Sequence, residues 1–132
     1  MRPPIALFDP GSGPAPLADQ IELYSHTQGA SYASVIPATA GQGTRFSLIT
    51  DSGSRLEVGI AVEQVSKAQA TLSVAVCERQ GEACRAVDSF TLSPSLRTDT
   101  RHSNAQHSRE TTDYSFMLRA SAVRPERVVP AG

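Results

Sequence analysis

Apolar and polar residues alternate along two long stretches in the middle of the chain, residues 55–64 and 70–77. The apolar positions are Leu56, Val58, Ile60, Val62, Ala70, Leu72, Val74 and Val76. Because successive side chains of a strand point to opposite faces, this pattern predicts two half-buried antiparallel strands. The polar segment 65–69 is short enough to join them as a turn. The other face carries small or charged residues, which indicates that something lies against it.

Four shorter stretches show the same alternation. Residues 20–25 and 31–36 are separated by the turn-forming sequence His-Thr-Gln-Gly and predict a hairpin. Residues 44–50 alternate around Phe46 and Leu48, and residues 87–93 alternate around Phe90 and Leu92 before Pro94 ends the strand. We therefore expect six strands and no helix before Pro94.

The chain changes character after Pro94. Residues 95–112 are strongly polar, whereas residues 113–123 contain apolar residues that fit two patterns. A helical stripe would contain Tyr114, Met117 and Leu118, and Thr112 or Asp113 could cap such a helix. A strand would instead alternate through Tyr114, Phe116, Leu118, Ala120 and Ala122. We expect a helix, and hence a mainly antiparallel α+β fold.

Three regions follow from these elements. Residues 1–19 hold five of the nine prolines and predict an extended arm. Residues 20–94 form the β-hairpin and the antiparallel sheet, and residues 95–132 form a C-terminal helical or extended segment.

Composition limits the class of protein. The 132 residues contain 39% hydrophobic residues and no Trp, which gives a lean core and favours stabilisation by association or by cysteines. The net charge of -1 provides no general basic field for nucleic acid. No apolar run reaches the length of a membrane span, and the first residues do not fit a signal peptide. We expect a chain made in a cytoplasm, without a membrane partner.

The residues predict no catalytic or metal centre. His102 and His107 are five positions apart, which places them on one face of neither a helix nor a strand. Cys77 and Cys84 lack the close spacing and the second pair of a zinc site. They are either two free thiols or a disulfide, formed within the loop or between chains. We expect no enzyme, no cofactor and no metal.

The order of these elements resembles that of the coat proteins of single-stranded RNA bacteriophages. Residues 20–37 resemble the opening hairpin of that family, residues 43–50 the next strand, and residues 56–76 its central strand pair. The resemblance covers residues 20–100 or so. It implies a homodimer in which an N-terminal hairpin and a five-stranded antiparallel sheet precede C-terminal helices that pack across the partner. Tyr114, Met117 and Leu118 would then lie in that helix packing.

For function, the resemblance implies a viral structural protein. Dimers would close into a small icosahedral shell around the genomic single-stranded RNA, assembled in the cytoplasm of a bacterial host and ending in the virion. The loop cysteines, Cys77 and Cys84, would crosslink subunits.

The family also binds an RNA hairpin on the inner face of its sheet, as a packaging signal and translational repressor. The matching positions here are Glu57, Gly59, Ala61, Glu63, Thr71, Ser73 and Ala75. Thr71 matches a threonine of the family's adenine pockets, whereas the family's neighbouring lysine and arginine are replaced here by Glu57, Glu63 and Ser73. Two acids on this face repel phosphate, so the shell carries over better than RNA recognition.

Two other classes fit the strand pattern. A secreted or periplasmic β-sandwich binding module, for carbohydrate or as an appendage on a protease, predicts an intrachain disulfide and a monomer. Another phage structural part, such as a decoration or tail protein, is the third.

Overall fold

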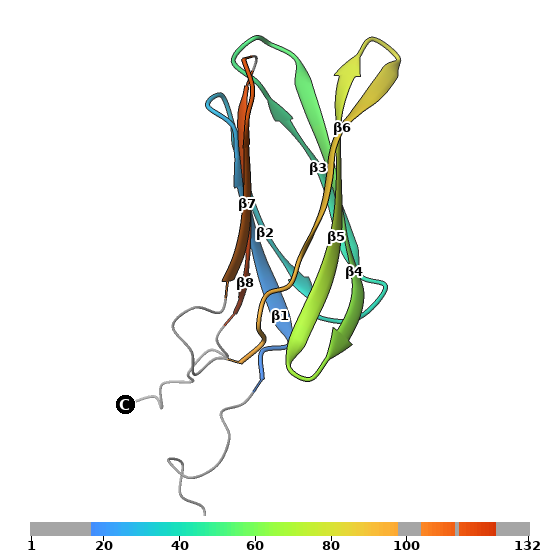
Figure 1. Cartoon of the computed structure of the whole chain (residues 1–132), viewed down its shortest axis with the longest axis vertical. Helices are drawn as coiled ribbons and strands as arrows, with labels where there is room; N and C mark the ends of the chain where they lie inside the picture. Colours follow the sequence, from blue (N-terminus) through green and yellow to red (C-terminus); the bar gives the residue numbers. More distant parts are fainter. Residues whose placement is uncertain (1–16, 98–103, 113, 124–132) are drawn as a thin grey trace, which may run out of the picture.

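The computed structural model describes residues 17–97, 104–112 and 114–123. These residues form eight strands in two antiparallel four-stranded sheets, shown in Figure 1. The strands are β1 (Gln20–His26), β2 (Ser31–Pro37), β3 (Gly43–Ile49), β4 (Arg55–Ser66), β5 (Gln69–Gln80), β6 (Ala83–Leu92), β7 (Asn104–Glu110) and β8 (Ser115–Ala122).

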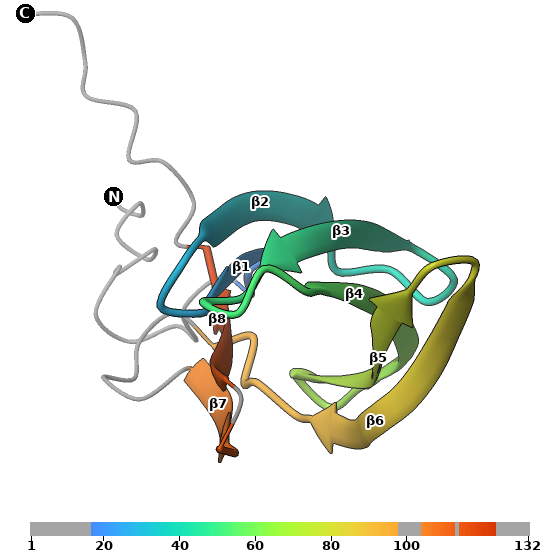
Figure 2. The same ribbon diagram turned by 90° about the horizontal axis from the view of Figure 1, so that it is seen from above.

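The sheet orders are β2-β1-β8-β7 and β3-β4-β5-β6. Neighbours within each sheet are therefore consecutive in the chain, except that β1 pairs with β8, which joins the first and the last of the described strands. Seen from above in Figure 2, the sheets face each other around one interior, with β2 beside β3 on one side and β6 beside β7 on the other. We call these two meeting lines the β2/β3 seam and the β6/β7 seam.

The interior is filled by alternate residues of both sheets, as the alternation of the sequence predicts. Leu56, Val58 and Val62 of β4 are almost fully buried. The opposite sheet supplies its own inward residues from β1, β2 and β8. These are Ile21, Leu23, Ile36, Phe116, Leu118 and Ala120. The two inward faces thus form a single core, consistent with sheet-on-sheet packing.

The α+β prediction is wrong, because the expected C-terminal helix is the strand β8. Leu118 of β8 is buried in the core, while Met117 points to the outer face, so the residues of the supposed helical stripe are divided between two faces. Tyr114 is buried just before the strand begins. The strand is favoured because β8 pairs with β1 along one edge and with β7 along the other. No helix occurs in the described parts of the chain.

The expected five-stranded sheet with a separate hairpin is also replaced. The N-terminal hairpin, β1 and β2, joins β8 and β7 in a sheet of its own. The strand β7 lies in the polar stretch after Pro94, where no strand was predicted. The segment expected to interlock with a partner therefore completes a sheet of its own chain.

The first described residues form backbone hydrogen bonds with the residues that follow Pro94. Leu17 forms an isolated β-bridge with Arg97, and the amide of Ala18 donates to the carbonyl of Leu96. The remaining part of the predicted arm, residues 1–16, lies outside the described residues, as do residues 98–103, 113 and 124–132. No helix with the length and apolarity to cross a membrane is found among the described residues.

Candidate functional site

The outer face of the β3-β4-β5-β6 sheet carries the positions predicted for RNA binding. In register across β4 and β5, Glu57 lies opposite Cys77, Gly59 opposite Ala75, and Ala61 opposite Ser73. Glu63 is the extra residue of a bulge, and Thr71 is opposite Gln64. The structure thus brings together all the predicted positions, namely Glu57, Gly59, Ala61, Glu63, Thr71, Ser73 and Ala75, on one face directed away from the core.

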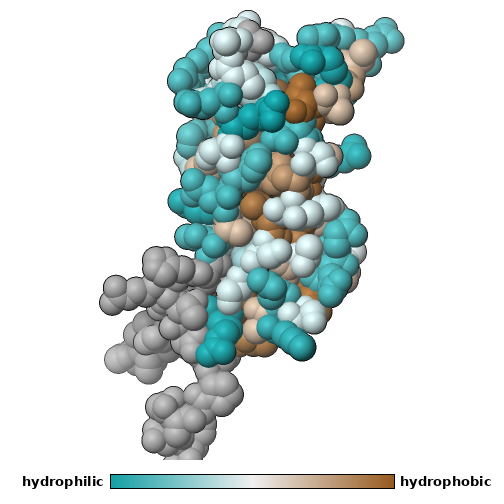
Figure 3. Space-filling model, viewed as in Figure 1, coloured by the Kyte–Doolittle hydropathy of each residue, from teal (hydrophilic) through white to brown (hydrophobic). Residues whose placement is uncertain are grey.

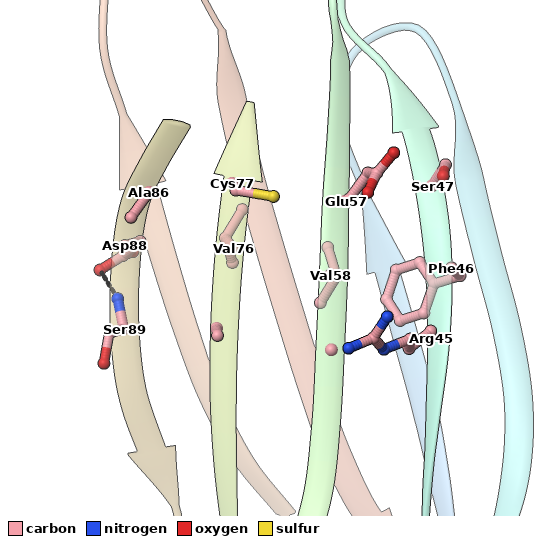
Figure 4. Close-up of a pocket in the computed structure, with 12 residues that line it drawn as sticks. Arg45, Phe46, Ser47, Glu57, Val58, Val76, Cys77, Ala86, Asp88 and Ser89 are labelled. Carbon is pink, nitrogen blue, oxygen red and sulfur yellow. Dashed lines mark hydrogen bonds between the residues drawn. The ribbon is translucent and has the colours of Figure 1, made fainter. Parts of the chain in front are cut away.

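Small side chains make this face hollow. One depression has a volume of about 440 Å³ and lies over the middle of the sheet (Figure 4). A second, of about 590 Å³, adjoins it. The residues common to both are Arg45, Gly59, Ala75 and Ser89. Because Gly59 has no side chain and Ala75 and Ser89 have short ones, the floor of the hollow lies close to the backbone.

Arg45 is a site residue that sequence reasoning missed. It lies on β3 opposite Gly59, and an added Cβ at Gly59 would stand 4.0 Å from its Nε atom. In Figure 4 its guanidinium reaches from β3 towards β4 across the floor. The missing side chain at Gly59 therefore leaves the space that Arg45 uses. The alternation around Phe46 could have shown that Arg45 points outward, but not which residue it meets.

Glu57 stands at the edge of the hollow and is paired with Arg79. The guanidinium donates from Nε to Oε2 and from Nη2 to Oε1, both at 2.8 Å. These hydrogen bonds lower the pKa of the Glu57 carboxyl, the charges of Arg79, Arg55 and Arg45 lower it further, and desolvation acts in the opposite direction. The pKa of Arg79 is correspondingly raised by the hydrogen bond to Glu57. This acid is therefore charged and largely neutralised by its partner.

Glu63 has a neutral hydrogen-bond partner, whereas Glu57 forms an ion pair. The hydroxyl of Ser73 donates to its Oε2 atom at 2.8 Å. The two acids that were expected to repel phosphate thus each have a partner on the same face, and Arg45 and Arg55 add positive charge near Glu57. The electrostatics of this face are more balanced than the sequence suggested.

Cys77 and Cys84 form a disulfide with each other within the chain, with their Cα atoms 5.4 Å apart. The expected crosslink between subunits is therefore replaced by an internal one. The cysteines also lie in strands β5 and β6, because the hairpin turns tightly at Gly81.

A bulge in β6 brings the two sulfurs to one face. Val76 pairs with Asp88, but Cys77 pairs with Ala86, so Val87 is the extra residue. In an unbroken register Cys84 would stand opposite Gln80 and point to the face opposite that of Cys77. The bulge moves it opposite Arg79, and the disulfide can then form on the outer face.

A second polar group lies at the β6/β7 seam. Nε2 of His107 is 2.9 Å from Oδ2 of Asp88, and Nη1 of Arg109 is 3.9 Å from Oδ1 of the same carboxylate. The imidazole also stacks on Phe90, with ring centroids 3.7 Å apart. Figure 3 looks onto this seam and shows apolar atoms between polar borders. Sequence reasoning placed His107 in a polar stretch and did not identify these partners.

No family model matches the chain, and the searches of curated proteins and of solved structures returned no match. What the site can do must therefore be inferred from its geometry. The hollow offers hydrogen-bond donors from Arg45, acceptors from Glu57, and the hydroxyls of Ser47 and Ser89 around a small-residue floor. Such a surface can bind a ligand that both donates and accepts hydrogen bonds.

Proposed function

We propose that this chain is a non-enzymatic binding module that holds a carbohydrate chain in the hollow on the outer face of the β3-β4-β5-β6 sheet. The observation that carries the proposal is the pair of adjoining depressions over Gly59 and Ala75. They are open along the sheet, which suits an extended ligand better than a compact one. A secreted or periplasmic sandwich of this kind was one of the alternatives left open by the sequence.

The chemistry of the hollow supports a ligand rich in hydroxyl groups. A hydroxyl both donates and accepts, so it can bond the Glu57 carboxylate and the Arg45 guanidinium at once. Ser47 and Ser89 add further hydroxyls to the lining. Small floor residues let sugar rings approach the sheet closely without displacing a side chain.

The internal disulfide supports an oxidising location for this module. Disulfides persist outside the cell and in the periplasm and are rare in reducing cytosol. The bond joins two neighbouring strands beside the hollow, so it also fixes the β5–β6 hairpin that forms part of the lining.

A glycan array with the purified, oxidised chain tests the proposal. We expect binding to a limited set of extended glycans, and loss of that binding in Ala75→Trp, which fills the floor. Ala33→Trp is the matched control, because Ala33 lies on an exposed position of the other sheet. Binding that is absent, or that is equally strong in Ala75→Trp, would overturn the proposal.

A viral structural protein is the second candidate. Four strands, β2, β3, β6 and β7, have a hydrogen-bonded neighbour within a sheet on one side only. Each of these edges adjoins an edge of the other sheet at a seam, but backbone groups that face away from its own sheet could pair with a second copy and extend a sheet between subunits. This route to a homodimer and a shell needs no C-terminal helix. RNA would contact the same outer face, where Glu57 is paired with Arg79.

Electron microscopy and light scattering of the protein expressed alone test this second role. Uniform spherical particles that carry RNA from the host would support a capsid found in the virion. A monomer at all concentrations would contradict the capsid role, and the binding module would then be the remaining candidate function.

A further inference from the structure

Three potential metal ligands meet on the outer face from three different strands. They are Glu57 of β4, Cys77 of β5 and Cys84 of β6, and their ligand atoms all lie within 4.8 Å of one another. Sequence spacing gave no sign of this group, because Glu57 is distant from the two cysteines along the chain. The register of the sheet and the bulge at Val87 bring it to them.

We propose that, when the disulfide is reduced, these three side chains bind one Zn²⁺ or a similar divalent ion. A dithiol reductant supplies two electrons and two protons, the S–S bond breaks, and two thiols form while the dithiol becomes a disulfide. Each thiol then loses its proton as its sulfur coordinates the ion. The proposal does not depend on carbohydrate binding, because it concerns the reduced chain.

The distances suit a tetrahedral ion. With Zn–S bonds of about 2.3 Å and a Zn–O bond of about 2.1 Å, a tetrahedral angle separates sulfur from oxygen by roughly 3.6 Å. Sγ of Cys84 already lies 4.0 Å from Oε1 of Glu57. The larger change is between the sulfurs, which must separate to roughly 3.8 Å around the ion. In Figure 4 the Cys77 sulfur points towards Glu57, so the ion would lie between these side chains.

The surrounding charges favour the deprotonated ligands. Two thiolates and one carboxylate bring three negative charges to a divalent ion, and Arg79 beside them offsets the excess. A carboxylate has about four lone-pair sites, so Oε1 of Glu57 can bind the ion while Arg79 keeps its hydrogen bonds. Arg79 is thus a positioning residue that fixes Glu57.

Three protein ligands leave the fourth position of the ion open. Glu57 and Cys77 both line the hollow, so the ion would be held at its edge. The reduced protein would therefore present an ion with an exchangeable water to whatever occupies the hollow. In the oxidised protein the sulfurs are bonded to each other and no such site exists.

Cobalt absorption spectroscopy tests the site. The full chain is reduced with a phosphine, its thiols are counted, and Co²⁺ is titrated under anaerobic conditions. We expect one ion per chain, with the thiolate charge-transfer absorption and the visible bands of a tetrahedral ion, displaced by Zn²⁺. The oxidised chain should show none of these bands. Circular dichroism of the reduced chain checks that the sheets remain folded.

Variants separate a built site from adventitious binding. Cys77→Ser and Cys84→Ser should each strongly reduce the charge-transfer band, because each removes one of the two thiolates, and Glu57→Gln should weaken cobalt affinity by roughly ten-fold or more. Glu63→Gln is the matched control, since Glu63 lies on β4 but bonds Ser73. No cobalt binding, equal binding in Glu57→Gln, or unfolding on reduction would overturn the proposal.

Discussion

Each of the two seams between the sheets contains one stacked pair of rings, but the polar groups around the two pairs differ. At the β2/β3 seam Tyr32 stacks on Phe46, with ring centroids 3.9 Å apart and planes inclined by 7°. At the β6/β7 seam Phe90 stacks on His107, with centroids 3.7 Å apart and planes inclined by 19°. Both seams therefore join the sheets through a pair of facing rings.

Their surroundings differ. A neutral hydrogen bond adds to the β2/β3 seam: the hydroxyl of Thr27, in the turn before β2, donates to the carbonyl of Ile49 at the end of β3 at 2.8 Å. The β6/β7 seam gathers His107 and Arg109 around the half-buried Asp88. One seam thus depends mainly on apolar packing, and the other depends partly on charge. The second should respond to salt, and the first should not.

Phe46→Ala should have the largest effect. Removing a half-buried ring that stacks on Tyr32 should lower the free energy of unfolding by about 3 kcal/mol, measured by urea denaturation. The loss should be the same at low and high salt. Val35→Ala, on an exposed position of the neighbouring strand β2, should change stability little. A loss that depends on salt would remove the distinction between the seams.

Gly43→Ala should disturb β3, the strand that forms one side of the β2/β3 seam, because Gly43 packs closely against the backbone of β4. An added Cβ there would overlap the carbonyl oxygen of Ile60, so the backbone must shift. We expect a loss of roughly 2 kcal/mol. In Gly59→Ala the new methyl group meets only Arg45, at 4.0 Å, so this variant should melt close to the parent temperature. Equal melting temperatures for Gly43→Ala and Gly59→Ala would contradict the expectation that only Gly43 lacks room for a side chain.

Asp88→Asn should weaken the β6/β7 seam by about 1 kcal/mol at low salt, because it removes the charge that attracts Arg109 and changes the bond to His107. The difference from the parent should shrink at high salt in urea titrations. Glu22→Gln, an exposed acid on β1, should show no such dependence. A salt-independent loss in Asp88→Asn would make both seams alike.

Glu57→Gln should have the smallest effect, and it tests the outer face, which belongs to neither seam. The folded-state pKa of Glu57 is lowered from its ordinary value of 4.5, chiefly by the hydrogen bonds from Arg79. Its contribution is therefore present above that value and is lost as the pH falls through the lower folded-state pKa. Thermal melting between neutral and acid pH should show a slightly shallower decline in Glu57→Gln. A steeper decline would contradict the direction of the shift.

The sequence predicted six strands correctly and described their faces well. Leu56, Val58 and Val62 are buried, and Gly59 and Ala61 lie outside, as alternation required. It was wrong after Pro94, because Tyr114, Met117 and Leu118 fit a helical stripe as well as a strand. The neighbouring partner β7 is a polar strand without apolar alternation, so it gave no local signal of a hairpin, and the other partner, β1, is almost one hundred residues earlier in the chain.

In the candidate site, too, some features follow from the sequence of each strand and others only from the pairing of strands. The predicted positions share one face because face alternation is a property of the strand itself. Arg45 and Arg79 entered the site only through the pairing of β3, β4 and β5, which depends on residues far apart in the sequence. The disulfide likewise depends on a bulge at Val87 that no spacing rule indicates.

What the sequence determined by itself is therefore the set of residues that each strand before Pro94 buries, because a period of two is fixed by local backbone geometry. The tertiary structure decided which strands pair, where the register shifts, and so which of Glu57, Cys77 and Cys84 come together. The reason is physical: a strand makes no hydrogen bonds within itself, so its backbone groups depend on partner strands, and the packing that selects a partner involves distant parts of the chain.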